Sequence, residues 1–138
     1  MSARSHDRER GQILPMVAIT LTLLSVPLSV FVIDSGLVMA SYAQLGETLE
    51  ASAEAGASMI DQTAFRQSGG HQVVLDPAAA RATSGQSLTT SGMPGLDTWS
   101  VTIQGNTITV SATVRVRLFG MGAVDLHQTR SASFVYGG

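Results

Sequence analysis

One uncharged apolar run near the start of the chain constrains the fold more than any other feature. Gln12 to Ile33 reads QILPMVAITLTLLSVPLSVFVI, and thirteen of its residues (five Leu, four Val, three Ile and one Phe) favour insertion into lipid. As a helix rising about 1.5 Å per residue, the run would cross the roughly 30 Å apolar core of a bilayer. A helix buried inside the protein is the alternative, but the rest of the chain offers too little apolar surface to enclose it. The run therefore predicts a membrane anchor.

Polar and helix-weakening residues inside the run are compatible with this prediction. Pro15 and Pro27 are tolerated more readily in membrane helices than in water-exposed ones. The four hydroxyl residues can bond back to helix carbonyls. They are Thr20, Thr22, Ser25 and Ser29.

Length and composition limit what can follow the anchor. The 138 residues leave room for one small domain, and a net charge of −2 without any Lys argues against a nucleic-acid partner. The chain has no Cys, which excludes disulfides, thiolate metal sites and a Cys nucleophile. We divide it into a basic leader (1–11), a transmembrane helix (12–34), a stalk helix (35–66) and a small α+β domain (67–138).

The charges that flank the anchor predict its orientation. Arg4, Arg8 and Arg10 precede the run, and the next basic residue is Arg66. Flanking positive charge stays in the cytoplasm, so we expect a single-pass membrane protein with its N-terminus inside and its C-terminal domain outside. A cleaved signal peptide is the competing interpretation. Its apolar region would span about 7–15 residues and end in small residues, and this run is longer and ends before Asp34.

A second helical pattern follows the anchor. Apolar or small residues recur at steps of three and four and occupy one face of a helix. They are Val38, Tyr42, Leu45, Leu49, Ala53, Gly56, Ile60 and Ala64. Asp34 and Gly36 are expected to mark the membrane exit, as a weak point where the helix meets the headgroups. Residues 12–66 together would form a rod of roughly 80 Å.

Each face of the stalk has two interpretations. Glu47, Glu50 and Glu54 lie opposite the apolar stripe, either as a solvated surface or as a docking surface for a basic partner. The apolar stripe packs either on the chain's own C-terminal sheet or on a sister helix. The glycines of the stalk do not form the GxxxG arrangement that would favour a sister helix.

The C-terminal region reads as a short helix and a three-stranded antiparallel meander. Asp76 and Pro77 are typical of the N-cap and first position of a helix. Strands are expected over 98–104, 107–119 and 124–136, joined by a Gly105-Asn106 hairpin and by Gly120-Met121-Gly122. The sheet has one apolar face, which the stalk can cover. The expected fold is α+β and pilin-like: a long N-terminal membrane-spanning helix packed on a small sheet with a short second helix.

The apolar face of the meander is expected to carry residues from all three strands. Trp99 is predicted to fill the core between sheet and helix. The other members are Val101, Ile103, Ile108, Val110, Ala112, Val114, Val116, Leu118, Val124, Leu126, Ala132, Phe134 and Tyr136.

Three stretches in the expected order resemble the TadE/TadG-like proteins of the bacterial tight-adherence (Flp) pilus machinery. They are Glu9-Arg10-Gly11-Gln12 before the anchor, Val32-Ile33-Asp34-Ser35-Gly36 with an Ala-rich stalk after it, and a tail of LDPAAAR, the 107–118 strand, FGMG and SASF. The resemblance implies a minor pilin or pseudopilin, with the lipid bilayer, other pilins and pilus-assembly proteins as its partners. It also implies a location in the bacterial cytoplasmic membrane, in the pilus or at the cell surface.

The resemblance further implies a processing site. Pilin-like precursors are cut after a Gly by a prepilin peptidase, and Gly11 is correctly placed to leave Gln12 as the new N-terminus. Processed relatives carry Glu five residues after the cut, where this chain has Met16. A buried carboxylate there can neutralise the N-terminal amine of a neighbouring subunit, and an unpaired buried charge is costly. Cleavage and retention as an uncleaved membrane component both stay open.

No residue pattern indicates catalysis or a cofactor. His6, His71 and His127 have no metal-ligand spacing, and no Ser sits in a nucleophile elbow. We therefore expect no enzyme, metal, cofactor or small-molecule substrate. Arg115 and Arg117 belong either to a solvated sheet face or to a small basic patch for subunit docking. The alternatives to a pilus subunit are a membrane-tethered surface binding module and a pilus-associated scaffold outside the filament.

Overall fold

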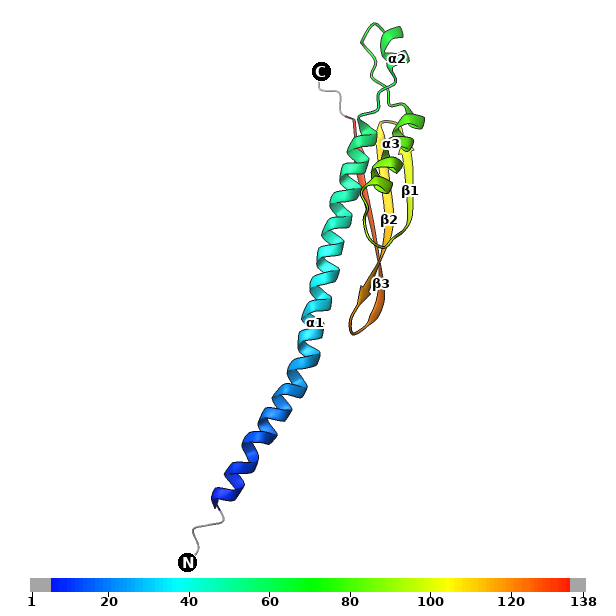
Figure 1. Ribbon diagram of the computed structural model, residues 1–138. Coiled ribbons are helices and arrows are strands. Elements are labelled where there is room, and N and C mark those ends of the chain that lie inside the picture. The colour runs from blue at the N-terminus through cyan, green and yellow to red at the C-terminus, as the bar shows by residue number, and fades with distance from the viewer. Residues whose placement is uncertain (1–5, 135–138) are drawn as a thin grey trace, which may run out of the picture.

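The molecule is a long helix with a small sheet packed against its C-terminal half (Figure 1). The computed structural model describes the backbone of residues 6–134 and the side chains of residues 13–134. Its elements are α1 (His6–Ala57), α2 (Gln62–Gln67), α3 (Pro77–Thr90), β1 (Leu96–Gln104), β2 (Thr107–Leu118) and β3 (Gly122–Ser133). This arrangement confirms the predicted α+β, pilin-like fold.

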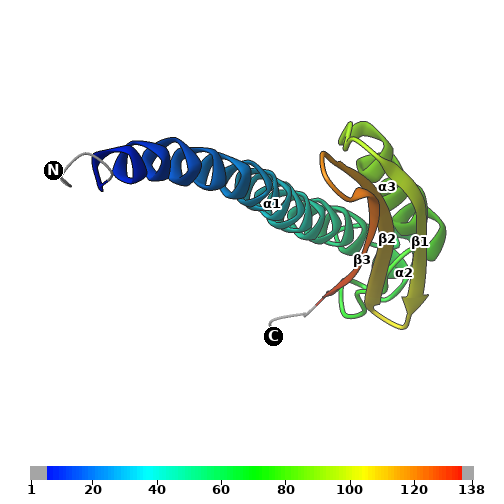
Figure 2. The ribbon, with the colours of Figure 1, turned by 90° about the horizontal axis from the view of Figure 1, so that it is seen from below.

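α1 is one unbroken helix of 52 residues, about 78 Å long at the usual rise. Its N-terminal half stands clear of the sheet (Figures 1 and 2). Its most apolar window is 0% buried, which distinguishes it from the core helix of a soluble protein. By length and composition it can cross a membrane, although an N-terminal signal sequence would satisfy the same criterion. The helix continues without a break through Asp34, Ser35 and Gly36, where the sequence predicted a weak point.

In the N-terminal half of α1, which we call the bare half, the hydroxyl residues bond back to helix carbonyls as predicted. Each donates to the carbonyl four residues earlier over 2.6–2.8 Å, so none presents an unsatisfied donor to an apolar environment. They are Thr20, Thr22, Ser25 and Ser29. Both prolines lie inside α1 without ending it.

The predicted end of the stalk helix was wrong. α1 ends at Ala57, and residues up to 67 form a separate turn and the short α2. Asp61 accepts hydrogen bonds from the amides of Thr63 and Ala64 at 2.9 and 3.0 Å, so it starts a new helix instead of continuing the old one. Ile60 pairs with Leu75 in an isolated bridge that closes this excursion. The helical periodicity of the sequence continues through residues 58–67. The Asp61 cap and the Ile60–Leu75 bridge nevertheless give these residues a different backbone conformation.

The sheet has the predicted order β1-β2-β3, antiparallel throughout. Gln104 pairs with Thr107 around the two-residue Gly105-Asn106 turn, and Gly105 has the positive φ (+59°) that this turn requires. Leu118 pairs with Gly122, so β2 and β3 form a long hairpin. β3 ends at Ser133, earlier than predicted, and Tyr136 lies outside the described residues.

One face of the sheet forms the core with α1 and α3. Alternate residues of β2 are fully or almost fully buried, as the strand's period-two pattern predicts. The core comprises Leu45, Leu49, Ala53 and Ala57 of α1, Leu75, Ala80 and Leu88 around α3, Met93, and Ile108, Val110, Ala112, Val114 and Val116 of β2. The stalk's stripe therefore packs on the chain's own sheet. Tyr42 and Ile60 belong to the predicted stripe but remain 49% and 37% exposed.

α3 shares the covering of the sheet with α1, and small residues bring the two helices together. A Cβ on Gly56 would overlap Ser84 Oγ and lie 3.0 Å from the carbonyl oxygen of Ala80. Ser84 donates to the carbonyl of Ser52 at 2.9 Å inside this contact. Asp76 caps α3 as predicted, accepting from the amides at 78 and 79.

Trp99 lies outside the buried core cluster, although the sequence predicted it there. Its ring lies 2.8 Å from where a Cβ on Gly85 would be, so it packs on α3. It stays 42% exposed. The residue is thus a cover over α3 at the edge strand, not a buried plug beneath the stalk.

Candidate functional site

The closest polar contact between the long helix and the sheet is at Asp34. Its carboxylate accepts hydrogen bonds from the backbone amides of Phe119 and Gly120 at 2.8 and 2.9 Å. The side chain is only 3% exposed. Charge-assisted bonds of this kind are stronger than neutral ones. Asp34 therefore holds the β2–β3 turn against α1, whereas the sequence predicted that it would face headgroups.

The turn held by Asp34, which we call the tip (Phe119, Gly120 and Met121), packs directly on the apolar run. A Cβ on Gly120 would come within 2.8 Å of Val30 Cγ1 and 3.3 Å of Asp34 Oδ2, so a larger residue would require Val30 to shift. Phe119 and Met121 are 81% and 71% exposed, and Met121 lines an open groove between the hairpin and α1. Gly36, the other predicted exit residue, contacts nothing at its Cβ position.

Below the tip, the bare half of α1 exposes a continuous apolar surface. Between Ile13 and Ile33, thirteen large apolar residues are each 52–76% exposed. Soluble monomers rarely expose an apolar surface of this extent, and by length and composition this helix could cross a membrane. Gly11 and Gln12, the predicted processing site, lie in the first turns of α1, and their side chains are outside the described ones.

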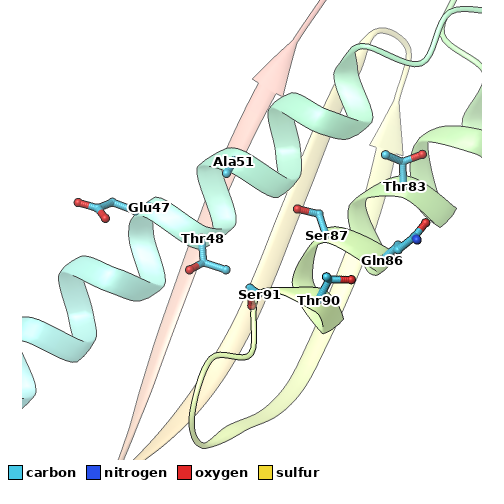
Figure 3. Close-up of a pocket in the computed structure, with 8 residues that line it drawn as sticks. All are labelled: Glu47, Thr48, Ala51, Thr83, Gln86, Ser87, Thr90 and Ser91. Carbon is cyan, nitrogen blue, oxygen red and sulfur yellow. The ribbon is translucent and has the colours of Figure 1, made fainter.

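The acidic residues of the stalk are exposed, and one of them, Glu47, lines an open groove. Glu47, Glu50 and Glu54 all face solvent. An open groove of about 650 Å³ runs between α1 and α3 (Figure 3). Its lining is Glu47, Thr48, Ala51, Thr83, Gln86, Ser87, Thr90 and Ser91. The groove thus offers one carboxylate among short hydroxyl and amide side chains.

The two predicted basic residues share the outer face of β2 but differ in their contacts. Arg115 Nε lies 3.1 Å from Asp125 Oδ1, across the hairpin, in an ion pair whose side chains are 63% and 54% exposed. Arg117 is exposed opposite Ala123. Along the same face Thr113 bonds His127 and Ser111 bonds Thr129. Across residues 13–134 no other salt bridge is formed, so Glu47, Glu50 and Glu54 have no basic partner there.

A buried amide lies on the inner face of β3, unforeseen in the sequence. Gln128 is 4% exposed, and within the described part of the chain neither its oxygen nor its nitrogen has a hydrogen-bond partner. It faces α1 at Gly46, where a Cβ would lie 3.0 Å from Gln128 Oε1. Unpaired buried amides destabilise the folded state.

Three side chains that matter here were not singled out for these roles from the sequence: Phe119, Met121 and Gln128. The signal for the first two was present, because a turn of glycines normally carries polar residues and this one carries Phe and Met. Among the described residues, no group of three or more His, Asp or Glu is placed to hold a metal ion. Comparison of the chain with models of protein families, with curated proteins and with solved structures gave no match.

Proposed function

We propose that the chain is a membrane-anchored, non-enzymatic minor pilin or pseudopilin of a tight-adherence type pilus machinery. The observation that carries the proposal is the division of α1 into two halves. One half is apolar and bare, and the other packs on a three-stranded sheet. A subunit of this shape can rest in a membrane by the bare half and present the sheet outside it. The order of the sequence motifs supports the pilus assignment.

The same division explains how such a subunit would act. Bare apolar helices that leave lipid must be covered by other helices, because exposed apolar surface is unfavourable in water. Neighbouring pilin helices in a bundle would supply that cover. The sheet, α3 and the part of α1 packed on them, which we call the head, would stay folded when α1 leaves the lipid, because their core already includes the inner face of α1. We infer an N-terminus in the cytoplasm of a bacterial cell and a head outside its cytoplasmic membrane, as the flanking charges indicate.

Processing determines which of two roles the subunit takes. Cleavage after Gly11 would leave a charged amine at Gln12, and position 16 carries Met instead of a carboxylate. A filament subunit needs that amine neutralised once it is buried. An uncleaved chain would keep its basic leader in the cytoplasm and remain a membrane component of the assembly apparatus.

The experiment combines the location and the mass of the native protein. Cells with and without prepilin peptidase are sheared, and the chain is sought in the pilus fraction and in the membrane fraction. The proposal expects a dependence on the pilus machinery: either a mass beginning at Gln12 with protein in sheared pili, or an intact mass with retention beside the assembly proteins. Uniform membrane distribution that ignores the pilus machinery would contradict it and would favour a tethered binding module.

A further inference from the structure

The exposed tip of the β2–β3 hairpin lies at the level where the apolar run of α1 ends. Gly120 packs on Val30, which is three residues before Ile33, the last residue of the run. At about 1.5 Å per residue, the contact is about 4.5 Å inside that end. A bilayer that covers the run up to Ile33 therefore meets the tip at its outer boundary. Figure 1 shows the hairpin extending along α1 toward the N-terminal half.

The chemistry of the tip suits that boundary. Residues 118–124 read LFGMGAV and carry no charge. The two large side chains of the tip, Phe119 and Met121, are 81% and 71% exposed. They do not join the hydrophobic core on the inner face of the sheet. Beside them, an open groove of about 370 Å³ is lined mainly by apolar residues of α1 and of the hairpin, among them Phe31, Val38 and Leu118. Side chains of this kind are typical of segments that enter the headgroup region.

Two of the three backbone amides of the tip are paired within the protein, as an environment without water requires. In lipid, every N–H group needs a partner within the protein. The amides of Phe119 and Gly120 already have one in the Asp34 carboxylate, at 2.8 and 2.9 Å. The carboxylate is itself shielded by this contact, at 3% exposed. One acidic residue thus satisfies two amides and fixes the tip beside the helix.

We propose that the tip inserts into the outer lipid interface as a second membrane contact, with Phe119 and Met121 among the lipids and Asp34 holding it there. The partner is the lipid surface itself. Two contacts would fix how far the head stands from the membrane and how it is turned about α1. The proposal rests on the membrane anchor of the proposed function.

Fluorescence from single cysteines tests the insertion, because the natural chain has no Cys. Phe119→Cys, Leu24→Cys and Asn106→Cys, each in the full-length chain, are labelled with a polarity-sensitive dye and reconstituted at low density in phosphatidylcholine vesicles. Leu24 is inside the apolar run, and Asn106 is in the turn at the opposite end of β2. Spin-labelled lipids then quench the dye, with the label near the headgroup or near the chain end.

The expected result is a graded pattern. The dye at position 119 shifts its emission to the blue and is quenched more by the shallow spin label than by the deep one. At position 24 the deep label quenches more, and at position 106 neither does. Met121→Cys repeats the result at a second site. Asp34→Ala, added to Phe119→Cys, reduces the shallow quenching because the tip is released.

Two results would overturn the inference while leaving the anchor intact. One is a dye at 119 that behaves like that at 106 while the dye at 24 is quenched. The other is a blue shift at 119 without quenching by either lipid, which would mean that protein covers the tip. If the dye at 24 is also unquenched, the anchor fails and the inference fails with it.

Discussion

Replacing Asp34 by Ala should free the β2–β3 tip from α1 without unfolding the head. The carboxylate makes two hydrogen bonds to backbone amides, at 2.8 and 2.9 Å. A hydrogen bond to a charged group contributes about 1.5–3 kcal/mol, and both amides are only partly buried, so water can replace part of the loss. The lower end of the range for two bonds gives about 3 kcal/mol. The core residues of β2 are not touched by the change.

The loss of about 3 kcal/mol at the tip can be measured as a faster rate of amide hydrogen exchange. Amide hydrogen exchange of Phe119 and Gly120 proceeds through local opening of the tip, and each 1.4 kcal/mol corresponds to about tenfold. Asp34→Ala should therefore accelerate exchange at these two amides on the order of 100-fold, measured by NMR on the full chain in detergent micelles. Amides of buried β2 residues such as Val110 should keep their rates. Asp34→Asn should fall between the two, since it retains one acceptor oxygen and turns an NH₂ group toward the other amide.

A matched control lies on the same hairpin. Asp125→Ala removes the carboxylate of the exposed pair with Arg115, which is worth at most about 1 kcal/mol, or about fivefold in exchange. If Asp34→Ala and Asp125→Ala changed the exchange of Phe119 and Gly120 equally, the assignment of Asp34 as the residue that holds the tip would be refuted.

The remaining predictions use thermal unfolding in micelles, monitored by the fluorescence of Trp99, the β1 residue that packs on α3. Gly56→Ala should destabilise the head by about 1–3 kcal/mol, because the new Cβ meets backbone and side-chain atoms of α3. Gly36→Ala should not lower stability and should gain up to about 1 kcal/mol of helix propensity, because nothing lies within 4 Å of its Cβ position. Equal effects of the two substitutions would contradict the close packing of α1 on α3 at Gly56. Gln128→Leu should raise stability by about 1–2 kcal/mol by removing an unpaired buried amide, and a clear loss would mean that the amide has a partner. Arg115→Ala should change stability by less than about 1 kcal/mol, since its ion pair is exposed; a larger loss would assign it a structural role.

Local sequence signals determined most of the elements. The length of the apolar run, the period-two pattern of 107–118, the Gly105-Asn106 turn and the Asp76-Pro77 cap each act within a few residues, so they could be recognised without knowing what lies across the fold. The stripe of the stalk also predicted which face of α1 would be buried. It failed at its C-terminal end, where the periodicity continued but α1 ends at Ala57 and Asp61 caps a new short helix.

Only the tertiary structure decided what Asp34 does and where the tip lies. Asp34 and the amides that it binds are 85 and 86 positions apart, and no local pattern encodes a bond over that distance. In the sequence, an Asp at the end of an apolar run indicates a meeting with headgroups, because an isolated carboxylate prefers water. The fold brings two backbone N–H groups to it instead, and a carboxylate with two donors is stable when buried. The unpaired amide of Gln128 is likewise a consequence of packing. The apolar neighbours of Gln128 bury their face of β3 against α1, and Gln128 is buried with them because it lies on the same face.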